Sequence, residues 1–341
     1  MSFSTQRTRP NFLSSDGKRG SFRGKPPPYG VPHYIWVTAG VSTASIVYCY
    51  FAYLEEVPIS HRKRWIATSP KLEKQLGDQE YQQLMRRFRK DVLPRNHPAS
   101  RTVERVGSRI ATASLDFAKM HNLKTYSTAP YTYTVVRSEM ANAFVLPGNH
   151  VFVMTGLFRY VRDEDELAGV LGHEVAHNLA RHAGEKISGS IVVNMLARLS
   201  FLVDPTGLLI AVLLPAATLF RELPHSRTQE TEADQIGVHL AAMACFDPRA
   251  SKRVFSAMKA DEGGGAHGRE PPEFLSTHPS HQSRISNFDK WLPDAVQIFE
   301  ADAGARCRTI RQQMEQARRA AAQQATYASG APKQLRDPYH D

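Results

Sequence analysis

Uncharged runs and helical periodicity predict a mainly helical chain. Residues 34–54 carry no charged side chain, and 21 residues at 1.5 Å per residue span the roughly 30 Å hydrocarbon core of a bilayer. Aromatic residues mark both ends of this stretch, as they do at membrane interfaces. Thr38, Ser42, Thr43 and Ser45 dilute its apolar character. We expect one N-terminal transmembrane helix, with a buried helix of a soluble domain as the alternative.

Two amphipathic helices and a hairpin follow. Apolar side chains recur at helical spacing over residues 69–93 and 99–118. Two short apolar runs, Ala143–Leu146 and His150–Met154, then flank the turn sequence at residues 147–149, which is Pro-Gly-Asn. These patterns predict an α+β fold that is mainly helical, with a small antiparallel sheet formed by this hairpin.

Charge adds a basic N-terminal segment. The 341 residues have a formal net charge of +10, and residues 1–32 contain six Lys or Arg against one acid, Asp16. This composition is typical of a mitochondrial presequence, and a disordered basic tail is the alternative. A nucleic-acid partner is not expected, because the remaining charge is spread out and the chain has no Cys/His finger spacing and no RNA-binding aromatic signature.

Three cysteines are too few for a disulfide scaffold in a chain of this length. Cys49 lies in the uncharged N-terminal run, so Cys245 and Cys307 are the pair that can meet outside a membrane. Either a disulfide or two buried thiols is expected there.

The sharpest chemical signal is the pair His173 and His177 with Glu174 between them. Asp163 and Glu166 can cap a helix that begins at this point. Histidines four residues apart project from one side of a helix, so both imidazoles can bind one tetrahedral Zn²⁺. Glu174 is then placed to take a proton from the attacking water. The alternative is a chance pair of surface histidines.

A third ligand is not found in the same segment. The metzincin pattern needs Gly and His where this chain has Ala180 and Ala183. His182 falls on the opposite side of an ideal helix from His173, and we expect a surface or packing residue there.

A second helix supplies the missing carboxylate. Glu230 and Asp234 lie one turn apart on one face, whereas Glu232 points elsewhere. We expect Glu230 to be the third ligand, with Asp234 accepting the free N–H of a ligand imidazole. A solvated acidic helix start, favoured by the helix dipole, is the alternative.

These motifs together resemble the HtpX/CAAX-protease family of membrane zinc peptidases, which are gluzincins. The resemblance covers about residues 55–300 and rests on residues 142–148, 173–177, 230–234 and 276–279, with Arg284. The longer string at residues 173–182 and the single N-terminal span are similar to the family's mitochondrial Oma-type branch in a fungal-like form. CAAX proteases themselves carry several spans, which this chain lacks.

The resemblance also implies roles for residues that spacing alone does not place. His278 is similar to a family histidine near the metal, either as an oxyanion donor or as a displaceable extra ligand. Arg284 is similar to an arginine that supports the tetrahedral intermediate. The first hairpin strand is similar to the edge that pairs with an extended substrate. Its residues are Ala143, Phe144, Val145 and Leu146.

The function that the resemblance implies is an ATP-independent zinc metalloendopeptidase with one Zn²⁺ per chain. It would sit in the mitochondrial inner membrane as a single-pass protein with its catalytic domain in the intermembrane space. Its expected partners are the lipid bilayer and membrane-protein substrates in quality control and stress response, a dynamin-like fusion protein among them. Gly40 and Ala44 can seat a partner helix, so homo-oligomer formation stays open.

A rival function is a zinc-stabilised membrane scaffold that binds client proteins without cutting them. Glu174 distinguishes the two, because a purely structural site needs no base beside the metal.

One uncharged run stays ambiguous. Residues 207–220 are too few to cross a bilayer, and a crossing there would separate His177 from Glu230. We expect this run to be buried in the domain or to dip into the membrane and return. The predicted organisation is a basic segment (1–33), a transmembrane helix (34–54), a helical connecting region (55–125), a zincin-like peptidase domain (126–300) and a polar C-terminal helix and tail (301–341).

Overall fold

The chain divides into two compact units, Met1–Ala52 and Tyr53–Asp341. The computed structural model describes residues 33–57, 59–123, 129–261, 273–278, 282–301, 307–313, 315–316 and 319. Within the described helices a few side chains, including those of residues 212–226, are also left out. The predicted basic segment and most of the predicted C-terminal tail therefore lie outside the described residues.

The first unit contains one described helix, α1 (His33–Ala52). Its described side chains are exposed, with Tyr34 at 67%, Ile46 at 70% and Tyr48 at 75%. Among the residues that the structure describes, no helix combines the length and the apolarity needed to cross a membrane. The predicted helix is thus present, but a transmembrane span over residues 34–54 is not shown.

The second unit opens with a two-stranded antiparallel sheet, β1 (Leu54–Glu56) and β2 (Lys63–Trp65). Two helices follow, α2 (Pro70–Arg87) and α3 (Pro98–Met120). Each begins with proline at its first position, where the missing N–H costs no hydrogen bond. The two predicted amphipathic helices are confirmed, although the first ends at Arg87 rather than near residue 93.

A three-stranded sheet lies next in the chain, in the order β3-β5-β4. It is formed by β3 (Thr132–Val136), β4 (Ala143–Leu146) and β5 (His150–Met154). The predicted hairpin is confirmed, with Ala143 opposite Val153 and Leu146 opposite His150. The sheet also contains a pair that was not predicted, because β3 joins β5 in parallel. Parallel pairing joins segments distant in sequence, so no local turn signal announces it.

The rest of the unit is helical. After the short 3₁₀ helix η1 (Thr155–Arg159) come α4 (Glu164–Leu179), α5 (His182–Val203), α6 (Leu208–Met243), α7 (Arg249–Ala260), α8 (Glu273–Thr277) and α9 (Gln282–Glu300). The mainly helical fold with small sheets agrees with the sequence-based prediction.

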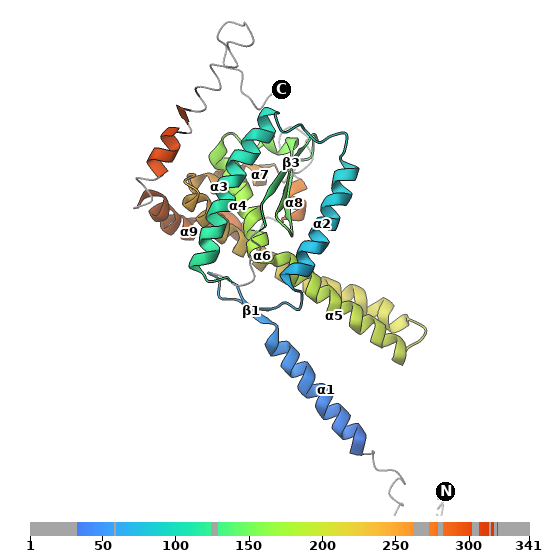
Figure 1. Ribbon diagram of the computed structural model, residues 1–341. Coiled ribbons are helices and arrows are strands. Elements are labelled where there is room, and N and C mark those ends of the chain that lie inside the picture. Colours follow the sequence, from blue (N-terminus) through green and yellow to red (C-terminus); the bar gives the residue numbers. More distant parts are fainter. Residues whose placement is uncertain are drawn as a thin grey trace, which may run out of the picture. The chain divides into compact units, whose positions relative to one another are not determined.

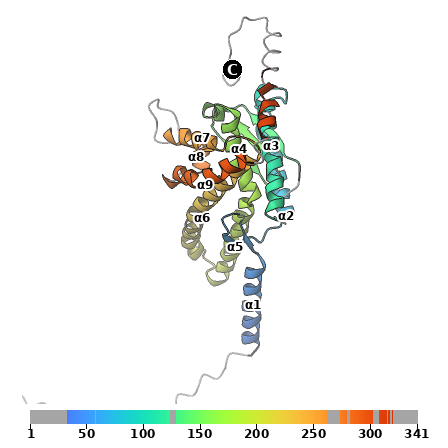
Figure 2. The same cartoon turned by 90° about the vertical axis from the view of Figure 1, so that its left-hand side faces the viewer.

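The core is centred on α4, which packs against α3, α6 and α7 (Figures 1 and 2). Leu167, Val170, Leu171 and Val175 are almost completely buried, as expected for a helix surrounded on all sides. The sheet lies between α2 on one face and α3 and α4 on the other (Figure 1). The motif helix is therefore inside the domain rather than on its surface.

Two further features complete the unit. α5 and the first part of α6 form a hairpin that extends from the core (Figure 1). Residues 208–220 are helical within α6, but most of their side chains lie outside the description. Cys245 and Cys307 form a disulfide, which confirms the first of the two alternatives for this pair.

Candidate metal centre

The start of α4 is fixed by a pair of reciprocal hydrogen bonds. The Asp163 carboxylate accepts from the N–H of Glu166 at 2.8 Å, and the Glu166 carboxylate accepts from the N–H of Arg162 at 2.8 Å. The predicted helix start is confirmed. Its register places His173 and His177 one turn apart, with their side chains 1% and 17% exposed.

Four electron-pair donors converge on one point. They belong to His173, His177, Glu230 and His278, and they lie within 4.8 Å of one another. The two Nε2 atoms of His173 and His177 are 3.1 Å apart. Glu230 Oε2 lies 3.4 Å from His173 Nε2, and Oε1 lies 3.3 Å from His177 Nε2.

These distances fit a tetrahedral ion. Zinc–ligand bonds of about 2.0–2.1 Å would hold the ligand atoms about 3.3 Å apart. Imidazole nitrogens and a carboxylate are also the donors that zinc prefers among first-row metals. The donor set therefore suits a zinc ion in both spacing and chemistry.

His173 is oriented from behind by two charged side chains. Its Nδ1 lies 2.9 Å from Asp234 Oδ1, so the Nδ1 proton is donated to Asp234 and the Nε2 lone pair faces the cluster. Arg284 binds the same carboxylate at two points. Its Nε lies 2.6 Å from Oδ2, and its NH2 lies 2.9 Å from Oδ1. Burial alone would raise the pKa of Asp234, but Arg284 and His173 hold it below its ordinary value.

His177 is oriented by two residues that were assigned no such role from sequence. His177 Nδ1 lies 2.8 Å from Nδ1 of His182, whose Nε2 lies 3.1 Å from Glu232 Oε2. His182 is 4% exposed. Of the two predicted alternatives, a surface residue is wrong and a buried one is confirmed, although its contact with His177 was not predicted. Burial lowers the pKa of His182 to about 4.

The cause of this difference is a break in the helix. α4 ends at Leu179, and Arg181 adopts a left-handed conformation with φ of 53°. The ideal-helix projection of His182 is invalid past that point, because α5 starts there in a new direction. The buried Arg181 side chain bonds the carboxylates of Glu55 and Glu73, each at 2.6 Å. These partners are more than a hundred positions from Arg181 in the sequence, so a local sequence pattern does not record this turn.

Glu174 lies beside the cluster but is not one of the four residues whose donor atoms converge there. Burial raises its pKa to about 8. One carboxylate oxygen accepts from the backbone N–H of Val145 on β4. The other, Oε1, is buried. This oxygen lies 3.3 Å from His278 Nε2 and accepts no hydrogen bond from the described residues, so it is available to take a proton.

His278 approaches the cluster from the opposite side, at the end of α8. Its Nδ1 is 3.0 Å from Glu230 Oε1 and 3.4 Å from His173 Nε2, and its Nε2 is 3.3 Å from Glu174 Oε1. Burial lowers the pKa of His278 to about 4. Burial alone would raise the pKa of Glu230, but His177 and His278 hold it well below its ordinary value.

Arg284 is placed differently from its expected role. The guanidinium lies 4.6 Å from the ring centre of Phe255, and NH1 donates to the carbonyl of His278 at 3.1 Å. With its other nitrogens on Asp234, it reaches the cluster at Glu230 Oε2 and at His173 Nε2, each 3.4 Å away. These contacts suit a residue that holds Asp234, Glu230 and His278 in place, and its role toward an oxyanion stays a prediction.

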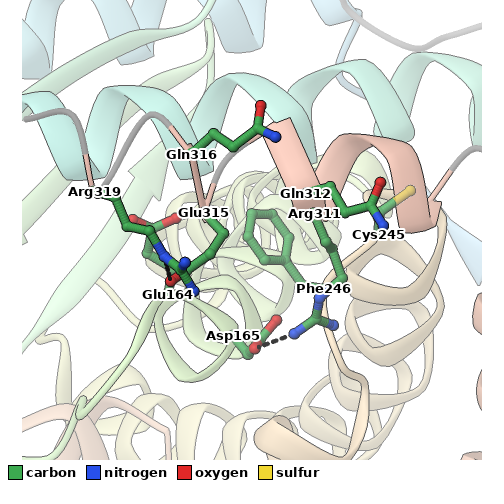
Figure 3. A pocket seen from close by; sticks show the side chains of 9 residues that line it. All are labelled: Glu164, Asp165, Cys245, Phe246, Arg311, Gln312, Glu315, Gln316 and Arg319. Carbon is green, nitrogen blue, oxygen red and sulfur yellow. Dashed lines mark hydrogen bonds and ion pairs between the residues drawn. The ribbon is translucent and has the colours of Figure 1, made fainter.

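A cavity of about 490 Å³ lies elsewhere in the unit, at the start of α4 (Figure 3). Its walls come from Glu164 and Asp165 on α4 and from Cys245 and Phe246 after α6. The C-terminal residues that line it are Arg311, Gln312, Glu315, Gln316 and Arg319. Arg311 pairs with Asp165 at 3.0 Å. No histidine lines this cavity, and it is separate from the metal centre.

Comparison with known proteins identifies relatives over most of the chain. Residues 99–292 match the profile of Peptidase family M48. "Mitochondrial metalloendopeptidase OMA1" of Schizosaccharomyces pombe is 40% identical over 261 residues, which is 76% of this chain and 72% of that protein. The protein of the same name from Saccharomyces cerevisiae is 35% identical, over 74% of this chain and 72% of its own length. "Metalloendopeptidase OMA1, mitochondrial" of Homo sapiens is 32% identical, over 76% of this chain and half of its own length.

Proposed function

This chain belongs to Peptidase family M48, and from that premise we propose that it is a zinc-dependent endopeptidase with its metal held by His173, His177 and Glu230. It is a mitochondrial metalloendopeptidase, as its fungal and animal relatives are. The observation that carries the choice of metal is the convergence of two imidazole nitrogens and a carboxylate at the spacing of a tetrahedral ion.

A bound zinc ion would polarise the scissile carbonyl and acidify the attacking water. Glu174 supplies the base. Its buried Oε1 has an open lone pair beside the cluster, and the Val145 N–H holds the other end of the carboxylate. A divalent cation held beside Glu174 would lower the pKa that burial has raised to about 8. A base poised near neutral pH is what proton transfer in hydrolysis requires.

His278 has two proposed roles, donor to the oxyanion or displaceable fourth ligand. The proximity of Nδ1 to Glu230 and His173 supports the second role in the state described. Rotation of this side chain away from Glu230 would open the fourth position to substrate and leave its N–H free to donate.

Strand β4 is the proposed substrate edge. It lies at the edge of its sheet, paired only with β5 among the described strands. The Val145 N–H points to Glu174, so the unpaired side of β4 faces the catalytic helix. Residues alternate along a strand, and Ala143 presents its backbone groups on the same side as Val145. An extended peptide bound there would lie next to the base and be recognised mainly through its backbone.

We place the chain in the inner membrane, with its peptidase domain in the intermembrane space and membrane proteins as substrates. The support is α1, an uncharged helix whose described apolar side chains are exposed. In isolated mitochondria the full chain should stay in the pellet after alkaline carbonate extraction, and a variant without residues 33–52 should be released. Recovery of the full chain in the supernatant contradicts membrane insertion.

The central test is Glu174→Gln in the purified full chain. Proteolysis of an unfolded reporter protein should fall on the order of 10²- to 10⁴-fold, because glutamine cannot accept the proton. Zinc measured by mass spectrometry should stay near one per chain, because Glu174 is not a ligand. His173→Ala and Glu230→Ala should lose both zinc and activity.

The matched control is Glu104→Gln, the same change on α3 at an exposed ion pair with Arg95, which should leave cleavage intact. Loss of zinc from Glu174→Gln overturns the assigned roles. A wild-type chain that binds zinc and client proteins but cuts none supports the scaffold instead.

A further inference from the structure

A chain of hydrogen bonds starts at His177 Nδ1, the ring nitrogen that does not face the ligand cluster. It ends at the first residues of the second unit. His177 Nδ1 meets His182 Nδ1 at 2.8 Å, and His182 Nε2 meets Glu232 Oε2 at 3.1 Å. Glu232 is 2% exposed. Its Oε1 accepts from Ser60 Oγ at 2.7 Å and from Arg62 Nε at 2.8 Å, and its Oε2 accepts from Arg62 NH2 at 3.0 Å. Ser60 and Arg62 belong to the connection between β1 and β2.

One placement of protons satisfies every member of this chain. The Nε2 atom of His177 faces Glu230 and His173, so its lone pair points at the ligand cluster and its proton is on Nδ1. That proton can only be donated to a lone pair on Nδ1 of His182. His182 then carries its own proton on Nε2 and donates it to Glu232. The carboxylate ends the chain and fixes the direction of both imidazole hydrogen bonds.

The contacts that orient His177 serve the same purpose as the contact of Asp234 with the other ligand histidine, His173. Asp234 accepts directly from His173 at 2.9 Å, and Glu232 accepts from His177 through one intervening imidazole. A carboxylate behind a ligand histidine fixes the ring orientation and makes the metal-facing nitrogen more basic.

We propose that His182 and Glu232 are positioning residues for His177, and that Ser60 and Arg62 hold Glu232 so that the affinity for metal depends on the β1–β2 connection. This inference rests on the proposed zinc site at His173, His177 and Glu230. It adds a structural link between that site and a segment that begins directly after α1.

The backbone is bent at three points to form the chain of contacts. Ile59 has φ of 67°, His61 has φ of 54° and Arg181 has φ of 53°. Left-handed conformations are unfavourable for residues with a Cβ, and most of all for a β-branched side chain such as isoleucine. Strain of this kind persists where the surroundings require one geometry. Here the three left-handed residues direct the side chains of Ser60, Arg62 and His182 toward Glu232.

Arg62 also ties the connection to α5. Two of its nitrogens bond the Glu185 carboxylate at 2.7 and 2.8 Å, and Gln229 donates to the same carboxylate at 3.0 Å. One guanidinium thus joins the β1–β2 connection to the first turn of α5 and, through Glu232, to the ligand helix α6.

The test is the affinity of the full chain for zinc, measured by competition with a chelator. His182→Leu should weaken zinc binding on the order of 10- to 100-fold. His182→Asn should recover part of the loss, because its side-chain oxygen can accept from His177 but cannot reach Glu232. The matched control is His239→Leu, which removes a half-buried histidine of α6 that contacts the carbonyl of Gln235, and zinc affinity should not change.

Two further measurements distinguish a His182 that positions His177 from one that only stabilises the fold. The visible absorption of the cobalt(II)-substituted chain should differ between His182→Leu and the control, because the field at the metal depends on His177. The melting temperature of the metal-free protein reports loss of packing, and it should not follow the order of zinc affinities among Leu, Asn and wild type.

Wild-type zinc affinity in a folded His182→Leu variant overturns the inference and leaves the zinc site standing. If that variant does not fold, Glu232→Gln is tested in its place. This substitution keeps the shape of the side chain and should still weaken zinc binding. Unchanged affinity in Glu232→Gln then rejects the proposal. A wild-type chain that binds no zinc rejects the proposed function itself.

Discussion

The two histidines on α4 occupy equivalent positions one turn apart, yet they are supported by different groups. His173 donates directly to Asp234, whose charge is balanced by Arg284. His177 reaches a carboxylate only through His182. The direct contact is short and almost completely buried. We therefore expect replacement of Asp234 to weaken zinc binding at least as much as replacement of any residue behind His177.

Asp234→Asn should weaken zinc binding on the order of 10- to 100-fold and leave the chain folded, because asparagine keeps an acceptor for His173. Asp234→Ala should also lower the free energy of unfolding by about 3–5 kcal/mol, because the buried Arg284 loses its closest carboxylate and is left with the longer contact to Glu230 at 3.4 Å. Chelator competition measures the first effect and denaturant unfolding the second. An empty site in Asp234→Ala together with full zinc occupancy in Glu230→Ala would mean that the two carboxylates have exchanged roles.

At the scale of the elements, the site depends on how closely α4 and α6 approach. Gly172 and Gly237 face each other where the helices cross. A Cβ on Gly172 would lie 2.8 Å from the carbonyl oxygen of Gly237, and a Cβ on Gly237 would lie 2.8 Å from the nitrogen of His173. Both contacts are with backbone atoms, which cannot rotate away. The glycine pair thus lets Glu230 on one helix reach the histidines on the other.

Gly237→Ala should lower the free energy of unfolding of the metal-free chain by about 1–3 kcal/mol through overpacking. Alanine favours a helix over glycine by roughly 0.5–1 kcal/mol, so the clash outweighs the gain. Zinc affinity should fall as well, because α6 is pushed away from His173. Gly40→Ala is the control, since a Cβ there meets nothing within 4 Å. Wild-type stability and zinc affinity in Gly237→Ala would contradict the close crossing.

At the scale of the whole second unit, ion pairs join its first residues to the helices that carry the site. Arg181 binds Glu55 and Glu73, and Arg62 binds Glu185 and Glu232. Burial alone would raise the pKa of both carboxylates, Glu185 and Glu232. Hydrogen bonds from Arg62 and Gln229 lower the pKa of Glu185 to about 2, and hydrogen bonds from His182 and Arg62 lower the pKa of Glu232 to about 2. Both carboxylates are thus ionised in the folded chain across the neutral range.

Because the pKa values of Glu185 and Glu232 are lowered in the folded chain, these carboxylates make its stability depend on pH. The two carboxylates have an ordinary pKa of 4.5 and bind protons more tightly in the unfolded chain. Their contribution to stability is therefore complete above about pH 4.5 and is lost as the pH falls toward 2. Denaturant unfolding of the metal-free chain between pH 2 and 7 should show a smaller fall over this window in Arg62→Leu than in wild type. Parallel curves for the two proteins would show that Arg62 does not set these pKa values.

The sequence by itself determined the elements with local signals. Helical periodicity, the Asp163–Glu166 cap and the Pro-Gly-Asn turn gave the helices and the β4–β5 hairpin, because each depends on neighbours within a few residues. The spacing of His173, His177, Glu230 and Asp234 likewise put side chains on helix faces that the fold brings together. The composition of residues 34–54 gave a helix, but not one apolar enough to show a membrane span.

Only the tertiary structure decided the parallel pairing of β3 with β5, the contact of Val145 with Glu174 and the chain from His177 to Arg62. Each joins residues far apart in sequence, so no local period records it. His182 illustrates the reason most clearly. A projection along an ideal helix turns it away from the site, and the left-handed residue Arg181 turns it back toward His177. That conformation is unfavourable in an isolated chain, and it is held here by buried ion pairs to Glu55 and Glu73, more than a hundred residues away in sequence.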